Sequence, residues 1–505
     1  MPEMISGKIG EVEERIKNSC SGCDDIILRR MRLGTGEQVE CLVVYVEAAV
    51  SNMMLEDSVI GKLLNHLWEL DAEKIRQAVL ENGLGISDVK ELETMEEAMA
   101  ALMAGNAIFF LEGYTRALKI SSKGYPGMGV VKAESEKVLR GSREAFSEAL
   151  KINTALIRKR IRTSELKVEE MFLGRRSQTL LALVYLEELA YPGLLDEVRG
   201  RLQAFEIDGI MDSGMIEQLT SDVWYSPFPQ FQTTERPDRA AAAVLDGRVV
   251  LLCDNSPVAL LLPTTLNSLV QTGDDYYGHF EIASLLRCIR YLAVFLAFSL
   301  PGLYLAVTGF HPQILPTNLV LSMAEARRGV PFPGMVEVLL MEVSFELMRE
   351  AGLRMPGPIG NMIGIVGGLI IGQSAVAANL ISPVIVIVEA LTALGSFSIP
   401  NEELSEAFRI LKYGMIFLCG FFGFYGFVTG WLLLIIHLAG LKSFGIPYLM
   451  PFAAGSRDGI SLWSDGVFRA PARRMKHRPV YTRRNARTRM RVKAQSEEEK
   501  DNVLR

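Results

Sequence analysis

One ionisable side chain stands in the middle of a long apolar run: Glu389, within VIVIVEALTALG. A carboxylate at membrane depth costs roughly 3 kcal/mol unless a partner or water meets it. Intramembrane acids are for this reason candidates for function by default. The sequence predicts that Glu389 either lines a cation path or binds neighbouring Asn and Gln side chains between helices.

A stripe of small and polar residues precedes Glu389. From Met355 to Val388 the chain has no Asp, Glu, Lys or Arg, yet it is rich in Gly, Ala, Ser, Asn and Gln. The glycines recur every four residues, which places them on one slowly turning side of a helix. Such a stripe is typical of close helix packing or of a pore or substrate-path lining. Its candidate residues are Gly360, Asn361, Gly364, Gly368, Gly372, Gln373 and Asn379.

Familiar catalytic and metal-binding motifs are missing from the sequence. The five His are scattered, and neither a phosphate-binding Gly-rich loop nor H-E-x-x-H or G-x-S-x-G occurs. Cys20 and Cys23 have metal or redox spacing, but no second Cys pair follows them, which favours a loop pair without a metal. We therefore expect no enzyme activity, no cofactor and no metal site.

Several apolar spans must position the stripe and Glu389. A helix of about 20 apolar residues crosses the hydrocarbon core. The candidate spans are residues 291–310, 357–381, 383–398 and 413–441. Four spans return the basic segment Pro471–Lys493, with ten Lys or Arg and no acid, to the side of the N-terminal region, as the positive-inside rule requires. No secretory signal opens the chain, so this side is predicted to be cytoplasmic.

An acidic amphipathic helix is expected between the first two spans, over Met335–Glu350. Four spans place it outside together with Arg327, Arg328, Arg349 and Arg354, against the positive-inside rule. We therefore expect this helix to lie along the membrane interface or to re-enter as a partial helix. Its candidate interfacial acids are Glu337, Glu342 and Glu346.

The part before the spans is built twice. CLVVYVEAAV from Cys41 and LALVYLEELA from Leu181 are both strands of β-formers ending in Tyr-x-Glu. A second pair, from Ala107 and from Arg248, reads as strand, turn, strand. The two offsets, about 140 residues each, agree within two. Duplicated α/β subdomains are the simplest explanation.

Between and after these repeats lie two unusual segments. The pattern over Glu134–Arg162 predicts a long connecting helix whose basic cluster, Arg158 to Arg162, is a solvated face. The segment YSPFPQFQTTERPDR predicts an ordered, proline-rich loop, either a strap between subdomains or a docking surface for a partner. The docking candidates are Tyr225, Pro227, Phe228, Pro229, Arg236 and Arg239.

The sequence thus predicts an α/β plus membrane α-helical fold. The basic tail should be disordered and bind anionic lipid rather than nucleic acid. The predicted parts are an N-terminal extension (1–35), a first α/β subdomain (36–128), a connecting helix (129–164), a second α/β subdomain (165–283), a helical membrane domain of about four spans (284–450) and a basic cytoplasmic tail (451–505).

Five segments, in this order, resemble the GerA family of bacterial spore germination proteins, the A subunits of nutrient germinant receptors. They lie between Gly141 and Arg478 and read GSREAFSEALKINTALIRKRI, EIDGIMDSGMIEQL, YSPFPQFQTTERPDR, PFPGMVEVLLMEVSFELMREAG and IGIVGGLIIGQSAVAANLISP.

This resemblance implies a protein of the inner spore membrane with a large cytoplasmic N-terminal region. It implies two partners, a transporter-like B subunit and a lipoprotein C subunit, in detecting small nutrients. It also implies a homo-oligomer that forms a nutrient-gated ion channel. The related stage V sporulation protein AF shares these motifs, in which case the chain is an auxiliary channel that amplifies ion release. A non-conducting sensor or scaffold subunit is a third alternative.

Overall fold

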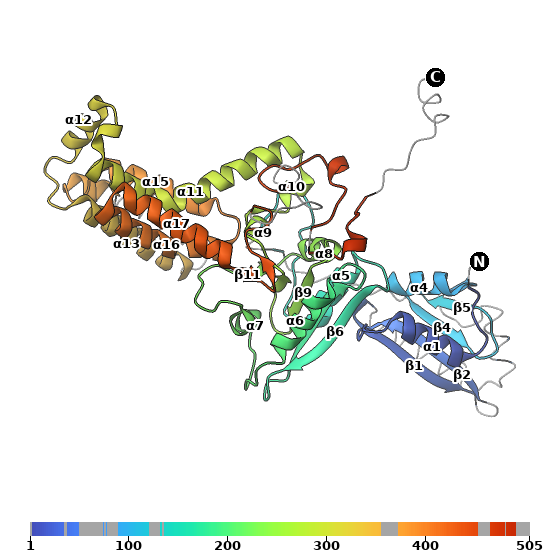
Figure 1. Ribbon diagram of the computed structural model, residues 1–505. Coiled ribbons are helices and arrows are strands. Elements are labelled where there is room, and N and C mark those ends of the chain that lie inside the picture. The colour runs from blue at the N-terminus through green and yellow to red at the C-terminus, as the bar shows by residue number, and fades with distance from the viewer. Residues whose placement is uncertain are drawn as a thin grey trace, which may run out of the picture.

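The computed structural model describes residues 3–34, 38–49, 74, 77, 89–120, 132–133, 136–354, 372–452, 465–479 and 481–490. Two α/β subdomains lie side by side, and an elongated bundle of helices extends from the second one (Figure 1). The segment after the last helix of the bundle returns to the second subdomain.

The first subdomain is a five-stranded antiparallel sheet in the order β1-β2-β4-β5-β3. Helices α1 and α4 pack on one face, where Val12 and Leu102 meet Leu42 and Phe110 in a buried core. Its elements are α1 (Ile9–Ser19), β1 (Ile26–Leu33), β2 (Val39–Val46), η1 (Glu47–Ala49), β3 (Val89–Leu92), α4 (Met95–Met103), β4 (Ala107–Leu111) and β5 (Ala117–Ile120).

The second subdomain repeats this sheet in the order β6-β7-β9-β10-β8. Its elements are α5 (Leu150–Arg158), β6 (Leu166–Leu173), β7 (Thr179–Leu186), α6 (Pro192–Leu202), α7 (Ser213–Thr220), β8 (Gln232–Thr234), α8 (Pro237–Leu245), β9 (Val249–Cys253), β10 (Ala259–Leu262), α9 (Leu266–Val270) and α10 (Asp274–Tyr277).

The two sheets agree in register as well as in order. Cys41 of β2 pairs with Leu111 of β4, and Leu181 of β7 pairs with Cys253 of β9. The paired positions are displaced by 140 and 142 residues, the same offsets as in the sequence repeat. Both sheets are therefore built from one strand plan.

Sheet two is covered on both faces, which explains why β7 reads as a continuous apolar run. Side chains alternate across a strand, so Ala182 and Val184 face α5 and α8, while Leu183 and Tyr185 face α6.

Two of the predicted boundaries differ from the structure. The predicted extension over residues 1–35 is wrong for its described part, because β1 is an edge strand of the first sheet and α1 packs in the core of the same subdomain. The predicted long connecting helix is shortened to α5, and residues 136–149 precede it without helix. Pro237, which lies in the segment predicted to be a loop, instead occupies the first turn of α8, where a backbone N–H would have no intrahelical acceptor.

The bundle contains five long helices among the described residues. It begins with α11 (Phe280–Phe310), and η3 (Pro312–Ile314) and α12 (Thr317–Ala326) lie at the far end (Figure 1). The others are α13 (Gly334–Arg354), α15 (Pro383–Phe397), α16 (Glu402–Phe422) and α17 (Phe424–Gly440). The short pieces β11 (Lys442–Ser443), β12 (Ile446–Pro447), η4 (Ala472–Arg474) and η5 (Arg484–Ala486) follow.

The predicted span 413–441 is divided into two antiparallel helices. Gly423 separates α16 from α17 with a φ of +60°, a conformation that glycine adopts readily. Phe310, the last residue of α11, packs against this turn. Gly426 then allows α17 to lie directly on the backbone of Leu418, where a Cβ would collide. The chain therefore turns back at the far end of the bundle instead of crossing once.

Candidate functional site

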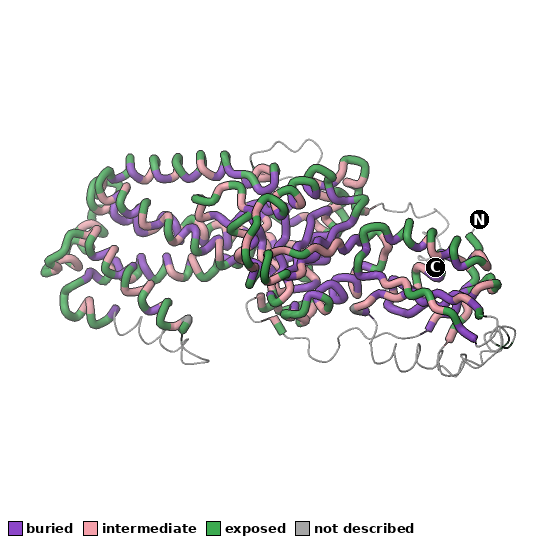
Figure 2. Tube along the Cα trace, turned by 90° about the horizontal axis from the view of Figure 1, so that it is seen from below, coloured by how far each residue is buried: buried purple, intermediate pink, exposed green. Residues whose placement is uncertain are grey.

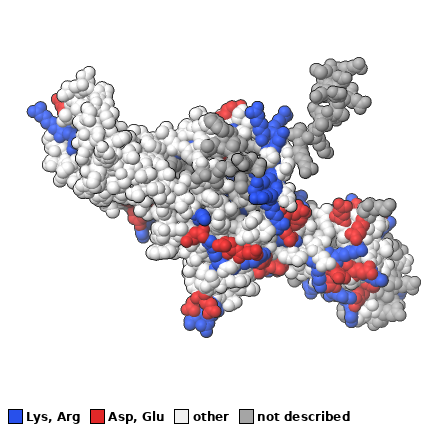
Figure 3. Space-filling model, in the orientation of Figure 1, with Lys and Arg blue, Asp and Glu red and all other residues white. Residues whose placement is uncertain are grey.

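Apolar surface and length separate the bundle from the rest of the chain. Among the described residues, α11 is the helix long and apolar enough to cross a membrane, and α15 and α17 are apolar but shorter. Exposed residues run along the outer sides of these helices (Figure 2). The visible face of the bundle carries few charges, whereas the α/β part carries both signs (Figure 3).

The predicted glycine stripe falls mostly outside the described residues: Gly360, Asn361, Gly364 and Gly368 are not described. The remaining three residues are. Gly372 is buried against Val386 of α15. Gln373 is exposed in a helical stretch over 372–377, and Asn379, just beyond it, is also exposed, with a φ of +53°. The two amides thus point out of the single chain.

Glu389 lies in the interior of the bundle. It is 2% exposed on α15, and its carboxyl group faces that of Glu342 on α13. Lys412 of α16 donates to Glu342 Oε2 at 2.5 Å. One oxygen of each carboxyl group has no hydrogen-bond partner among the described residues. Three helices therefore bring two acids and one cation together in a buried cluster.

A row of ion pairs along α13 and α16 continues this cluster toward the α/β part. Arg409 Nη1 lies 3.1 Å from Glu346 Oε2, and Arg349 Nη2 lies 3.7 Å from Glu402 Oε1. Two acids one turn apart on α13, Glu342 and Glu346, face two cations one turn apart on α16, because residues three and four apart share a helix face. Lys412 and Arg409 were not among the predicted site residues.

At the far end, Glu337 is fully buried and joins three elements. It accepts from Arg327 after α12 at 2.8 Å and from the backbone N–H of Ser382, which precedes α15, at 2.9 Å. The structure thus places Glu337 and Glu342, expected at the membrane interface, between helices of the bundle. Because α13 runs the length of the bundle, Arg327 and Arg349 lie at opposite ends of it.

The base of α11 is tied to the α/β part by a second buried network. Arg287 Nε lies 2.9 Å from Asp275 Oδ2, and Arg287 Nη1 lies 2.7 Å from Asp465 Oδ1. Arg290 also binds Asp275. Burial alone would raise the pKa of Asp275, but the two guanidinium groups lower it below its ordinary value.

The proline-rich loop connects the α/β part to the bundle. Phe228 is buried edge-to-face on Phe408 of α16 and near Tyr448. Ser226 is hydrogen-bonded to His437 in the last turn of α17, at 2.9 Å. The buried Phe228 and Pro229 are thus part of a strap between the two parts.

The remaining docking candidates divide into buried and exposed residues. Arg236 is buried and paired with Asp238, Arg239 binds Glu136, and Pro227 is half-buried. Tyr225 and the neighbouring Trp224 are 69% and 86% exposed and pack edge-to-face on each other. Of the predicted docking candidates, Tyr225 is thus the exposed one, and Trp224 extends its aromatic surface.

The joint between the two subdomains holds residues that the sequence placed elsewhere. Arg158, expected on a solvated face, is 1% exposed and forms a two-pronged ion pair with Asp25. Cys20 and Cys23 are buried free thiols at this joint, and Cys23 Sγ lies 3.4 Å from the carbonyl oxygen of Leu166. Burial raises the pKa of Cys20 to about 12, so this thiol stays protonated at neutral pH.

The basic tail is docked over its described residues, contrary to the predicted disorder. Arg478 Nε donates to the carbonyl of Leu245 at 2.8 Å, and Arg483 Nε donates to that of Ala190 at 2.7 Å. Backbone carbonyl groups of the second subdomain thus bind arginine side chains of the tail that its basic composition predicts to be solvent-exposed.

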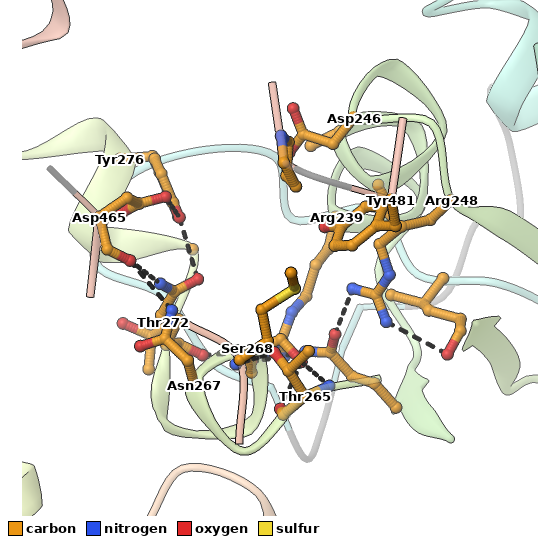
Figure 4. A pocket seen from close by; sticks show the side chains of 18 of the residues that line it. Arg239, Asp246, Arg248, Thr265, Asn267, Ser268, Thr272, Tyr276, Asp465 and Tyr481 are labelled. Atoms are coloured by element: carbon orange, nitrogen blue, oxygen red, sulfur yellow. Dashed lines mark hydrogen bonds between the residues drawn. The ribbon is translucent and has the colours of Figure 1, made fainter. Parts of the chain in front are cut away.

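A cavity of about 270 Å³ lies where this tail meets the second subdomain (Figure 4). Its walls come from β8, α8, α9, α10 and the segments around Pro451, Asp465 and Tyr481. Arg248, Arg239 and Asp246 are among its charged lining residues.

An α/β part carrying a helical bundle with an apolar outer surface and a buried charged cluster defines a membrane-associated protein. Comparison with known families is specific: residues 14–481 match the model of the Bacillus/Clostridium GerA spore germination protein family. The chain belongs to this family.

Individual relatives are similar over most of their length. The chain is 38% identical to the uncharacterized membrane protein YfkQ of Bacillus subtilis, over 95% of this chain and 93% of that protein. It is 36% identical to spore germination protein KA of the same organism (93% and 86% covered) and 32% identical to its stage V sporulation protein AF (76% and 77% covered). It also resembles the crystal structure of the N-terminal domain of the A subunit of the Bacillus megaterium germinant receptor GerK3, with 27% identity and a TM-score of 0.41, over 52% of this chain and 97% of that one.

Proposed function

We propose that this chain is the A subunit of a spore germinant receptor that conducts cations across the inner spore membrane, with its α/β part in the cytoplasm. Family membership supports a role in germination at a membrane. Conduction is the further step, and it rests on the buried charged cluster.

The observation that carries the proposal is Glu389. Two carboxyl groups and one ammonium group meet between α13, α15 and α16, so the cluster holds more acid than base. A buried carboxylate without its own cation is costly, and proteins keep such groups where an ion or proton uses them. A permeating cation would supply the missing charge.

Assembly of several copies is part of the proposal. Gln373 and Asn379 are exposed on the outside of one chain. At membrane depth their amides need partners, because lipid offers no hydrogen bonds. A second copy, or a transporter-like B subunit, would provide them, and a lipoprotein C subunit would complete the receptor.

The exposed aromatic pair fits the membrane surface. Ser226, which directly follows Tyr225, is bonded to His437 in the last turn of α17, and Leu433 and Ile436 of that helix are exposed. Trp and Tyr are enriched at the level of the lipid head groups. We place this pair there.

The 32% identity to stage V sporulation protein AF supports a second candidate function, an auxiliary channel that amplifies ion release. Both functions use the same conducting cluster and differ in partners. Co-purification with receptor B and C subunits separates them.

Ion flux through purified full-length protein in liposomes tests conduction. Wild type should release K⁺, and Glu389→Gln should change the rate at least about tenfold, since one charge at a low-dielectric site changes a barrier by more than 1.4 kcal/mol. Glu350→Gln is the matched control, because Glu350 is exposed on α13 and pairs with Arg354. Absence of flux from wild type would instead favour a non-conducting sensor or scaffold.

A further inference from the structure

The cavity at the tail has one wall from the second subdomain and one from the segment after the bundle. Ala242 of α8 and Leu261 of β10 lie on the first side. Pro451, Pro479 and Tyr481 lie on the other. Its volume, about 270 Å³, lies just below the range of about 300–1,000 Å³ typical of ligand pockets, which favours a small ligand.

Most charged lining residues already have partners. Asp238 binds Arg236 at 2.6 Å, and Asp465 binds Arg287 at 2.7 Å. Arg239 is paired with Glu136. Within the lining, Arg489 Nη1 lies 3.3 Å from Asp246 Oδ1. Arg248 is the charged lining residue to which none of these ion pairs belongs.

Arg248 is a buried cation held by neutral groups. It is 6% exposed, and it donates to Gln232 Oε1 at 2.6 Å and to the carbonyl of Leu261 and Thr264 Oγ1, both at 3.2 Å. Figure 4 shows Arg248 at the cavity wall, with dashed lines for the hydrogen bonds of its guanidinium group to other lining residues. Among the described residues no carboxylate forms an ion pair with it, and Nε has no hydrogen-bond partner.

Burial lowers the pKa of Arg248, yet a guanidinium group remains charged near neutral pH because its ordinary pKa is far above neutrality. A buried charge without a counter-ion is unfavourable. An anion in the cavity would supply that counter-ion, and a carboxylate is the organic anion that a guanidinium group commonly pairs with.

We propose that this cavity binds a small organic monocarboxylate, whose carboxylate pairs with Arg248 and whose apolar body packs against Leu261, Pro451 and Pro479. The lining acids Asp238, Asp246 and Asp465 disfavour ligands of higher negative charge, such as phosphate. The apolar part of the lining would make no favourable contact with an inorganic ion such as phosphate.

The ligand would also hold the tail in place. Asp465 lines the cavity and at the same time binds Arg287 of α11. A ligand that binds only when the tail is docked stabilises the docked state by mass action. The proposal does not depend on conduction, because its test measures binding alone.

Isothermal titration of the purified full-length protein in detergent tests this site. The probes are butyrate, isovalerate and phenylacetate, each beside its neutral primary amide, and inorganic phosphate. We expect at least one carboxylate to bind with a stoichiometry of one, and neither its amide nor phosphate to match it. Failure of all three carboxylates, or equal binding of the amide or of phosphate, would overturn the proposal.

Two variants locate the binding. Arg248→Lys should weaken it at least tenfold, because an ammonium group on a shorter, flexible side chain cannot keep the bonds to Gln232, Leu261 and Thr264 that hold the cation at the wall. Ala242→Trp should abolish binding by filling the cavity without removing a hydrogen bond, and it decides the matter if Arg248→Lys does not fold. Leu219→Trp, at an exposed position of α7 outside the lining, is the control and should bind as wild type does. Unchanged affinity in Ala242→Trp would contradict the assignment.

Discussion

Lys412 Nζ lies 2.5 Å from Glu342 Oε2, and both side chains are buried between α13 and α16. The two residues are 70 positions apart in sequence. Glu389 approaches the same pair from α15, so one ammonium group stands between helices that supply two carboxyl groups. This arrangement links three helices through one buried cluster, and it is there that we propose a cation binds.

The pair itself should be costly to break from one side. Lys412→Met leaves Glu342 and Glu389 buried without a cation, and we expect a loss of about 3–5 kcal/mol in stability. The double variant Lys412→Met with Glu342→Met should recover most of this loss, because no buried charge of that pair remains. Thermal melting in detergent measures both. A double variant as unstable as the single one would show that packing, not charge, is responsible.

Arg158 and Asp25 should hold the two α/β subdomains together. Asp25→Asn leaves the buried Arg158 unpaired, for an expected loss of about 3–5 kcal/mol. Lys151→Met removes an exposed ion pair to Glu47 across the same joint and should cost less than about 1 kcal/mol. Denaturant unfolding of the full chain compares them, and equal effects would argue against a special role for the buried pair.

Stability should fall with pH because of Glu217 on α7. Burial and the nearby Glu403 raise the pKa of Glu217 from 4.5 to about 8. Between these values the folded chain holds a proton that the unfolded chain lacks, so stability decreases as pH rises through this range and levels off above it. Glu217→Gln should therefore flatten the decline of the melting temperature between about pH 5 and pH 8. The exposed Glu206→Gln should leave it unchanged, and an equal slope in Glu217→Gln would refute the assignment.

Trp224 should report contact with lipid head groups. Shallow brominated lipids should quench tryptophan fluorescence strongly in wild type and clearly less in Trp224→Phe, because bromine quenches at short range and the aromatic pair is exposed beside the end of α17. Trp431→Phe, in the middle of α17 and bonded to Ser299, is the control for deeper positions. Identical shallow quenching with and without Trp224 would place the pair away from the membrane.

The strands were predictable because their information is local. The β-formers around Tyr45 and Tyr185 carry the repeat, and the structure pairs the surrounding residues in equivalent registers. Glu389 could be singled out because a lone acid in an apolar run has few explanations. Each of these signals lies within about ten residues.

Long-range partners could not be read in the same way. Arg158 looks like part of a solvated basic cluster until Asp25, 133 positions away, is brought against it. The tail looks disordered because its acceptors are backbone carbonyls, such as that of Ala190, which leave no trace in sequence. In the sequence, Gly423 cannot be distinguished from the other small residues of an apolar run. In the structure its φ of +60° ends one helix and lets the next begin, which divides the predicted span.

The most direct test of conduction past Glu389 is the reversal potential of the purified protein in a planar bilayer under a KCl gradient. The reversal potential of the wild type should be shifted from zero toward the equilibrium potential of K⁺, because excess acid in the path favours cations. Glu389→Gln should move the potential toward zero, and Glu350→Gln should leave it in place. A wild-type potential on the Cl⁻ side, or one that Glu389→Gln does not change, would contradict a cation path at this carboxylate.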